Sequence, residues 1–107
     1  MKRFGQTIRI KPEYLDLYMQ EHANVWPGVL AQIKRSNIQN YSIYLHEDIL
    51  FAYFEYTGSD FKADMAAMAA DPETIKWWDY MKPMQSQWPE TPLEDWWLNM
   101  KEVFHLD

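Results

Sequence analysis

Two runs of β-branched and aromatic residues, separated by only two polar residues, constrain the fold more than any other feature of the sequence. Residues 41–46 read YSIYLH and residues 49–56 read ILFAYFEY, with Glu47-Asp48 between them. These residue types favour strands, and so short a polar connection is typical of a β-hairpin. We therefore predict a hairpin over residues 41–56.

The segment before the hairpin predicts one strand and two helical pieces. Apolar and polar residues alternate loosely over residues 3–10, and Lys11-Pro12 follows them. This pattern predicts a strand followed by a turn. Apolar residues then recur at helical spacing as far as His22, and Trp26 is disfavoured in a helix because a proline follows it. We expect a break near residues 23–26.

The second helical piece is predicted from Pro27 to about Ser36. Its expected buried stripe consists of Val29, Leu30 and Ile33, and residues 37–40 are predicted to form a turn.

The segment after the hairpin predicts two helices and a last strand. Ser59 or Asp60 is a suitable cap for a helix over residues 61–70. Asp71-Pro72-Glu73 then marks the start of another helix, which should end near Pro83. Residues 85–95 are acidic and interrupted by prolines, so we predict a loop there. A final strand is expected within residues 96–106, where Val103, Phe104 and Leu106 have the highest strand propensity.

This order, β-α-β-β-α-β, predicts an α+β fold of the ferredoxin-like type over residues 1–107 as a single domain. Such a fold has a four-stranded antiparallel sheet with helices on one face only. Aromatic residues make up 17 % of the chain, more than a small core needs. We therefore expect a second copy to cover the open face, which predicts a homodimer.

Composition restricts the partners and the location. The net charge of −6 disfavours nucleic acid, and the longest apolar runs are far shorter than the ~20 residues of a membrane span. The first residues lack the apolar stretch of a signal peptide, so we expect a soluble, cytoplasmic protein. A neutral small molecule suits these properties better than a polyanion.

Common cofactor and nucleophile motifs are absent. The chain has three glycines and no phosphate-binding loop, and no pair of histidines has the spacing of a zinc site. There is no cysteine, and no serine lies in a nucleophile-elbow context. We expect neither a metal nor an organic cofactor.

Tyr18 and His22 are the first candidates for chemistry. They are four residues apart, so on a helix they project from one face, and histidine has the side-chain pKa best suited to acid–base catalysis at neutral pH. The alternative is that His22 is an exposed residue at a helix end. His46 beside the hairpin turn and His105 near the C-terminus are expected to be non-catalytic.

Aromatic side chains supply the candidates for ligand binding. Trp77 and Trp78 project about 100° apart on a helix, so one packs in the core and the other either meets a partner subunit or faces a ligand. Tyr41 and Tyr44 should point to opposite faces of their strand, and one of them can reach a pocket between sheet and helices. Aromatic faces suit the C–H faces of a pyranose, while indole N–H groups donate to hydroxyls.

Several blocks together resemble the L-rhamnose mutarotase family. They are Tyr18-x-x-x-His22-x-x-x-Trp26-Pro27, Asn40–Leu45, Leu50-Phe51-Ala52, Lys76-Trp77-Trp78-x-Tyr80-Met81 and Glu102–Leu106. The resemblance implies a dimeric α/β barrel that interconverts the α and β anomers of L-rhamnose without a cofactor. It implies that His22 is the proton donor and that Tyr18, Tyr41, Trp77 and Trp78 bind the sugar. For the reaction we expect His22 to protonate the ring oxygen as imidazolium, with Tyr18 either holding a hydroxyl or relaying the second proton.

The segment 87–97 departs from the family pattern, which leaves the preferred sugar open among 6-deoxy hexoses and related pyranoses. Because the same dimeric barrel also serves other activities, three alternatives remain. They are a cofactor-free monooxygenase, a haem protein and a non-catalytic sugar-binding module.

Overall fold

Strands β1 (Lys2–Ile10) and β3 (Ile49–Tyr56) pair along their whole length and form the centre of the sheet. The computed structural model, which describes residues 1–107, places β2 (Ile38–His46) on the other side of β3 as its hairpin partner. The free edge of β1 pairs with two short strands, β4 (Gln85–Ser86) and β5 (Leu98–Met100). All pairings are antiparallel and the order is β2-β3-β1-β4, which confirms the predicted ferredoxin-like α+β fold.

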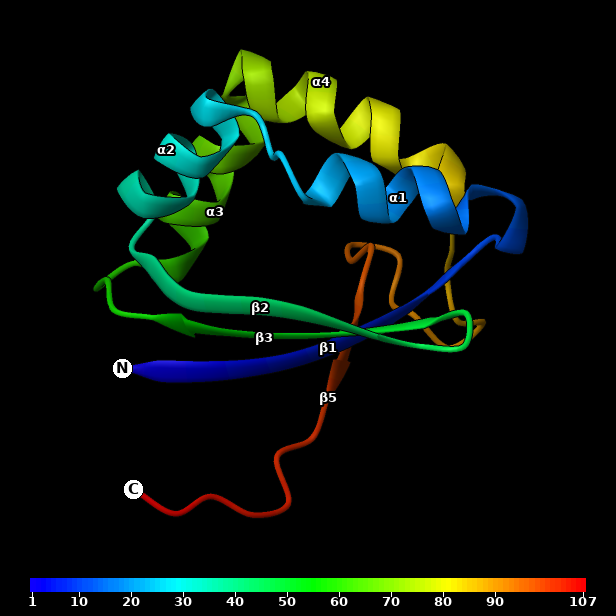
Figure 1. Ribbon diagram of the computed structural model, residues 1–107. Coiled ribbons are helices and arrows are strands. Elements are labelled where there is room, and N and C mark those ends of the chain that lie inside the picture. The colour runs from blue at the N-terminus through cyan, green and yellow to red at the C-terminus, as the bar shows by residue number, and fades with distance from the viewer.

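All helices lie on one side of the sheet (Figure 1). A 3₁₀ turn, η1 (Pro12–Tyr14), leads into α1 (Leu15–His22), and the chain breaks as predicted before α2 (Pro27–Arg35). Helix α3 (Phe61–Ala70) and helix α4 (Pro72–Met81) follow the hairpin, and η2 (Lys82–Met84) leads to β4.

Aspartates begin two of these helices, as predicted. The side chain of Asp60 accepts a hydrogen bond from the backbone N–H of Ala63, and that of Asp71 accepts one from Thr74. Each carboxylate satisfies a backbone donor that a helix start leaves without an intrahelical partner.

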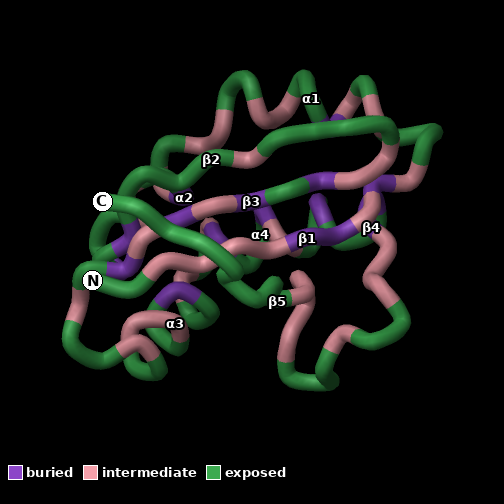
Figure 2. The backbone as a smooth tube through the Cα atoms, turned by 90° about the horizontal axis from the view of Figure 1, so that it is seen from below, coloured by how far each residue is buried: buried purple, intermediate pink, exposed green.

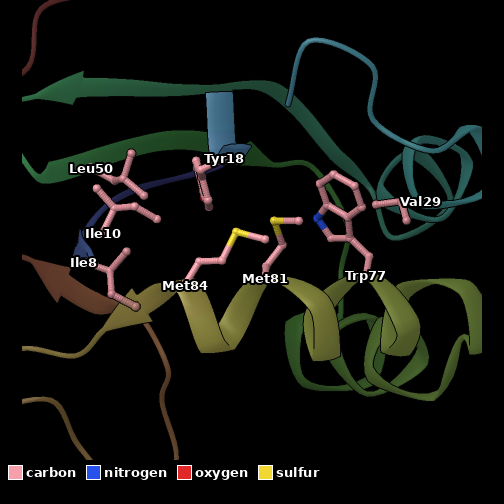
Figure 3. Packing of buried hydrophobic residues seen from close by; sticks show 8 residues of the cluster. All are labelled: Ile8, Ile10, Tyr18, Val29, Leu50, Trp77, Met81 and Met84. Carbon is pink, nitrogen blue, oxygen red and sulfur yellow. The ribbon is translucent and has the colours of Figure 1, made fainter. Parts of the chain in front are cut away.

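The main core forms where the sheet meets α1, α2 and α4. Figure 3 shows Tyr18 lying between the sheet residues and the methionines that follow Trp77 along the chain. The cluster consists of Ile8, Ile10, Tyr18, Val29, Leu50, Trp77, Met81 and Met84. A second cluster under α3 consists of Ile38, Phe54, Tyr56 and Met68.

The face of the sheet away from the helices is open. Figure 2 looks at this side and shows that β2 is largely exposed, whereas buried positions follow β3 and β1. Phe51 is 37 % exposed and its cross-strand partner Tyr44 is 67 % exposed. None of the helices is long and apolar enough to cross a membrane.

The structure corrects four details of the sequence predictions. Leu30 is 47 % exposed and lies outside the buried stripe, since it follows Val29 by about 100° around α2. Strand β2 begins at Ile38, inside the predicted turn. Gln85 and Ser86, predicted to be loop, pair with β1 as β4. The last strand ends at Met100, and residues 101–107 have no regular structure.

Candidate active site

A cleft of about 300 Å³ opens between α1 and the β2–β3 hairpin. Its volume is at the lower end of the range for small-molecule sites, which suits a monosaccharide. The wall is mostly apolar and consists of Ile10, Leu15, Tyr18, Met19, His22, Ala23, Ile43, Tyr44, Leu45 and Leu50. Of the predicted site residues, Tyr18 and His22 line this cleft.

Tyr18 and His22 stack on each other, as their four-residue spacing predicts. Their ring centroids are 4.0 Å apart. His22 Nδ1 lies 2.9 Å from the backbone oxygen of Tyr18. A carbonyl oxygen only accepts, so Nδ1 must carry the proton and donate it. In the neutral ring Nε2 is therefore the basic atom, and it has no hydrogen-bond partner in the protein and is not enclosed.

Burial lowers the pKa of His22 below its ordinary value of 6.5. The hydrogen bond to the Tyr18 carbonyl and the charge of Glu21 oppose this effect but do not reverse it. Because desolvation disfavours the charged ring, His22 is neutral at neutral pH. The resting form is thus a base and not the imidazolium acid that we expected from the sequence.

The phenol of Tyr18 is held neutral by the same effect. The residue is 4 % exposed, and burial raises the pKa of its hydroxyl. A hydrogen bond from Gln85 Nε2, 3.2 Å from the Tyr18 oxygen, opposes the rise, and the nearby Tyr41 phenol adds to it. Tyr18 is consequently a hydrogen-bond donor and not a base at any pH near neutrality.

Tyr41 lies in a bulge of β2. Gln39 pairs with Glu55 and Ser42 pairs with Tyr53, so two residues of β2 oppose Phe54 alone. The ring of Tyr41 packs against Phe54 at 5.4 Å. The residue as a whole is 39 % exposed, yet desolvation of its hydroxyl raises its pKa to about 12.

The two adjacent tryptophans have different surroundings. Trp77 is 6 % exposed and meets the His22 ring edge-on at 5.3 Å. Its indole N–H has no partner in the protein and is not enclosed, so it is free to donate to a ligand. Trp78 packs at the border of both core clusters, with Lys82 Nζ 5.8 Å from its ring.

The structure therefore brings Tyr18, His22 and Trp77 together in one aromatic cluster, whereas Tyr41 packs on Phe54 and Trp78 lies outside the cluster. The other two histidines lie elsewhere: the His46 side chain is 78 % exposed, and His105 bonds to Asp107. No group of three or more His, Asp or Glu side chains is placed to hold a metal ion.

Sequence reasoning missed Gln85 and Trp96. Gln85 is 6 % exposed, and its amide lies between the Trp96 indole and the Tyr18 hydroxyl. The only local signal was a glutamine directly after an apolar helix end, and this does not reveal which tertiary partners it meets.

A model of the L-rhamnose mutarotase family matches residues 3–106. The chain belongs to this family. L-rhamnose mutarotases from Oceanobacillus iheyensis and Phocaeicola vulgatus are 33 % and 34 % identical to it, each over the full length of both chains. A crystal structure of an L-rhamnose mutarotase from Formosa agariphila superposes with a TM-score of 0.78 and covers all of both chains. At 23 % identity this last likeness shows the fold alone.

Proposed function

We propose that this member of the L-rhamnose mutarotase family interconverts the α and β anomers of L-rhamnose, or of a closely related 6-deoxy hexose, by acid–base ring opening and closing. Its family makes it an isomerase that acts on sugar anomers. The observation that carries the mechanism is the fixed tautomer of His22, which leaves Nε2 basic and unpaired at an apolar cleft. Nothing in the comparisons favours a monooxygenase, a haem protein or a non-catalytic sugar-binding module.

The reaction requires one proton to leave the anomeric hydroxyl and one to reach the ring oxygen. Neutral His22 takes the anomeric proton on Nε2 while the C1–O5 bond breaks and C1 becomes an aldehyde carbon. The electron pair of the broken bond goes to O5, which takes the proton from the imidazolium. Rotation about C1–C2 then presents the other face of the aldehyde, and the reverse transfers close the ring.

One histidine is sufficient for both transfers because the anomeric oxygen and the ring oxygen are bonded to the same carbon. The cycle returns His22 to its neutral form and consumes no co-reactant. A positioned acid–base group of this kind contributes about 10²–10⁴-fold to the rate.

The remaining site residues hold the sugar in this proposal. Tyr18 donates its hydroxyl hydrogen to the sugar oxygen that gains charge, and its raised pKa keeps that proton in place. Tyr41 offers a second hydroxyl in this proposal. Trp77 offers an unpaired indole N–H, and Trp78 contributes apolar surface next to it.

Exchange NMR of the two anomeric signals of L-rhamnose tests the function directly. We expect the wild-type chain to accelerate exchange and His22→Ala to lose about 10²–10⁴-fold of that acceleration. His46→Ala is the matched control, since His46 is exposed and outside the cleft, and it should retain the wild-type rate. Full exchange in His22→Ala would contradict the assignment, and a panel of other hexoses would rank the substrates.

The homodimer and the cytoplasmic location predicted from the sequence are further parts of this proposal. The open sheet face supports the dimer, since it presents Phe51 and Tyr44 to solvent. The tail adds exposed apolar side chains on Val103, Phe104 and Leu106, which are 79–90 % exposed. Apolar surface of this extent is typical of a subunit interface.

A further inference from the structure

A chain of hydrogen bonds links Tyr18 to the segment that follows β4. The indole Nε1 of Trp96 donates to Gln85 Oε1 at 2.7 Å. Gln85 Nε2 donates in turn to the Tyr18 hydroxyl oxygen at 3.2 Å. Gln85 is 6 % exposed and pairs with Ile10 of β1, so its backbone is fixed by the sheet.

The chemistry of the donors sets the direction of this chain. An indole N–H only donates, so Gln85 must turn its oxygen toward Trp96 and its NH₂ group toward Tyr18. The Tyr18 oxygen then accepts from Gln85, and its own hydrogen points to another acceptor. Without the indole, the amide is free to turn over and accept that hydrogen, which takes it away from a ligand.

Trp96 is itself held in place from two sides. The side-chain amide of Gln87 donates to the backbone oxygens of Asp95 and Trp96, each at 3.1 Å. Lys82 Nζ lies 5.2 Å from the centre of the Trp96 ring. None of residues 87–97 lines the cleft. The contacts of Gln87 and Lys82 hold this segment next to β4 and direct the Trp96 indole at Gln85.

We propose that Gln85 and Trp96 are positioning residues that fix the Tyr18 hydroxyl as a hydrogen-bond donor toward the sugar. This rests on the proposed function, because Tyr18 is taken to bind the substrate. It gives the segment 87–97 a role in sugar binding through Gln85.

The first test compares Trp96→Phe with Trp97→Phe. Both remove one indole N–H from neighbouring positions, but the Trp97 indole does not bond to Gln85. We expect Trp96→Phe to lower kcat/KM for anomer exchange roughly tenfold, the effect of one misdirected hydrogen bond, and Trp97→Phe to change it less than about twofold.

Repeating Trp96→Phe in a Tyr18→Phe background shows whether Trp96 acts by orienting the Tyr18 hydroxyl or only by packing. With the hydroxyl gone, the substitution should change kcat/KM by less than about twofold, because the two residues act through one hydrogen bond. A second tenfold loss in that background would overturn the proposal.

A readout without sugar is the indole N–H signal of Trp96 in a ¹H–¹⁵N spectrum, identified by its loss in Trp96→Phe. Gln85→Met should move this signal and leave the Trp97 signal in place. An unmoved Trp96 signal overturns the hydrogen-bond chain, whereas a moved signal in a protein without anomer exchange overturns only the proposed function. If Gln85→Met does not fold, the comparison of Trp96→Phe in the two backgrounds decides.

Discussion

Burial acts in opposite directions on the pKa values of the two stacked side chains at the cleft. It lowers the pKa of the His22 imidazole and raises that of the Tyr18 phenol. Both shifts favour the uncharged form, because desolvation penalises whichever form carries the charge. The cleft therefore holds a neutral base beside a neutral donor, which suits a substrate without charge.

In the proposed mechanism, the pH dependence of the reaction follows from the protonation state of His22. Because its pKa lies below 6.5, the basic form predominates at pH 7 and above. We predict that kcat/KM is constant between about pH 7 and 8 and falls about tenfold per unit once the pH drops below the pKa of His22. The measurement is the enzyme-dependent exchange rate from pH 5 to 8, after subtraction of spontaneous mutarotation.

His46→Ala should keep the same profile, since His46 lies outside the cleft. A rate that rises as the pH falls through 6.5 would instead identify the imidazolium as the active resting form.

The sequence was sufficient to find this pair but not to assign its proton positions. The spacing of Tyr18 and His22 predicts a shared helix face whatever surrounds them. The tautomer of His22 depends on a backbone acceptor, and the orientation of Tyr18 depends on Gln85, 67 residues further along the chain. Contacts at such separation follow from the tertiary fold and leave no local pattern.

At the scale of elements, local sequence signals predicted well where the helices begin and end. Pro27 and the aspartates Asp60 and Asp71 act within one turn of their own position, so the break after α1 and the two helix starts occur where expected. The turn predicted over residues 37–40 is confirmed only at Asn37, because Asn40 lies in the β2 bulge. Both asparagines have positive φ, and asparagine is favourable in either setting.

The last strand shows the limit of strand propensity. Val103 and Phe104 are strong strand formers, yet they are 90 % and 79 % exposed and pair with no strand of the chain. A strand needs a neighbouring strand to pair with, and the pairing of the C-terminal segment with β1 ends at Met100.

The start of α4 provides a prediction at this scale. Asp71 accepts hydrogen bonds from the backbone N–H and the hydroxyl of Thr74, at 3.0 and 2.8 Å. We predict that Asp71→Ala lowers Tm by about 4–8 °C, while Asp79→Ala on the exposed side of α4 leaves it nearly unchanged. Thermal unfolding followed by circular dichroism measures both.

The same contact should make the effect of Asp71→Ala depend on pH. The hydrogen bonds from Thr74 lower the pKa of Asp71, so its contribution is present above the ordinary carboxylate pKa and is lost as the pH falls through the lowered value. An equal Tm difference at pH 7 and at pH 2 would contradict the capping explanation.

At the scale of the whole molecule, the main question is what covers the open face of the sheet. A chain of 107 residues with helices on one side leaves the other side of β2 and β3 without a layer of its own. A second copy would cover it in the arrangement proposed above.

Light scattering during size-exclusion chromatography tests the dimer. We predict a mass of twice the 13.0 kDa of one chain, and a shift toward the single-chain mass for Phe51→Asp, which places a charge in the open face. Leu30→Asp is the control, because Leu30 is exposed on the helical side and should not affect the mass. A wild-type mass of one chain would rule out the dimer.

The break before Pro27 has an electrical consequence. It makes His22 the last residue of α1, so the ring lies at the end of the helix where backbone carbonyls carry partial negative charge. While the His22 ring is neutral, these partial charges stabilise it little. In the proposed mechanism the ring becomes a cation during turnover, and the helix end would then stabilise that charge. We therefore expect the proline that interrupts the helix to lower the energy of the proposed protonated intermediate.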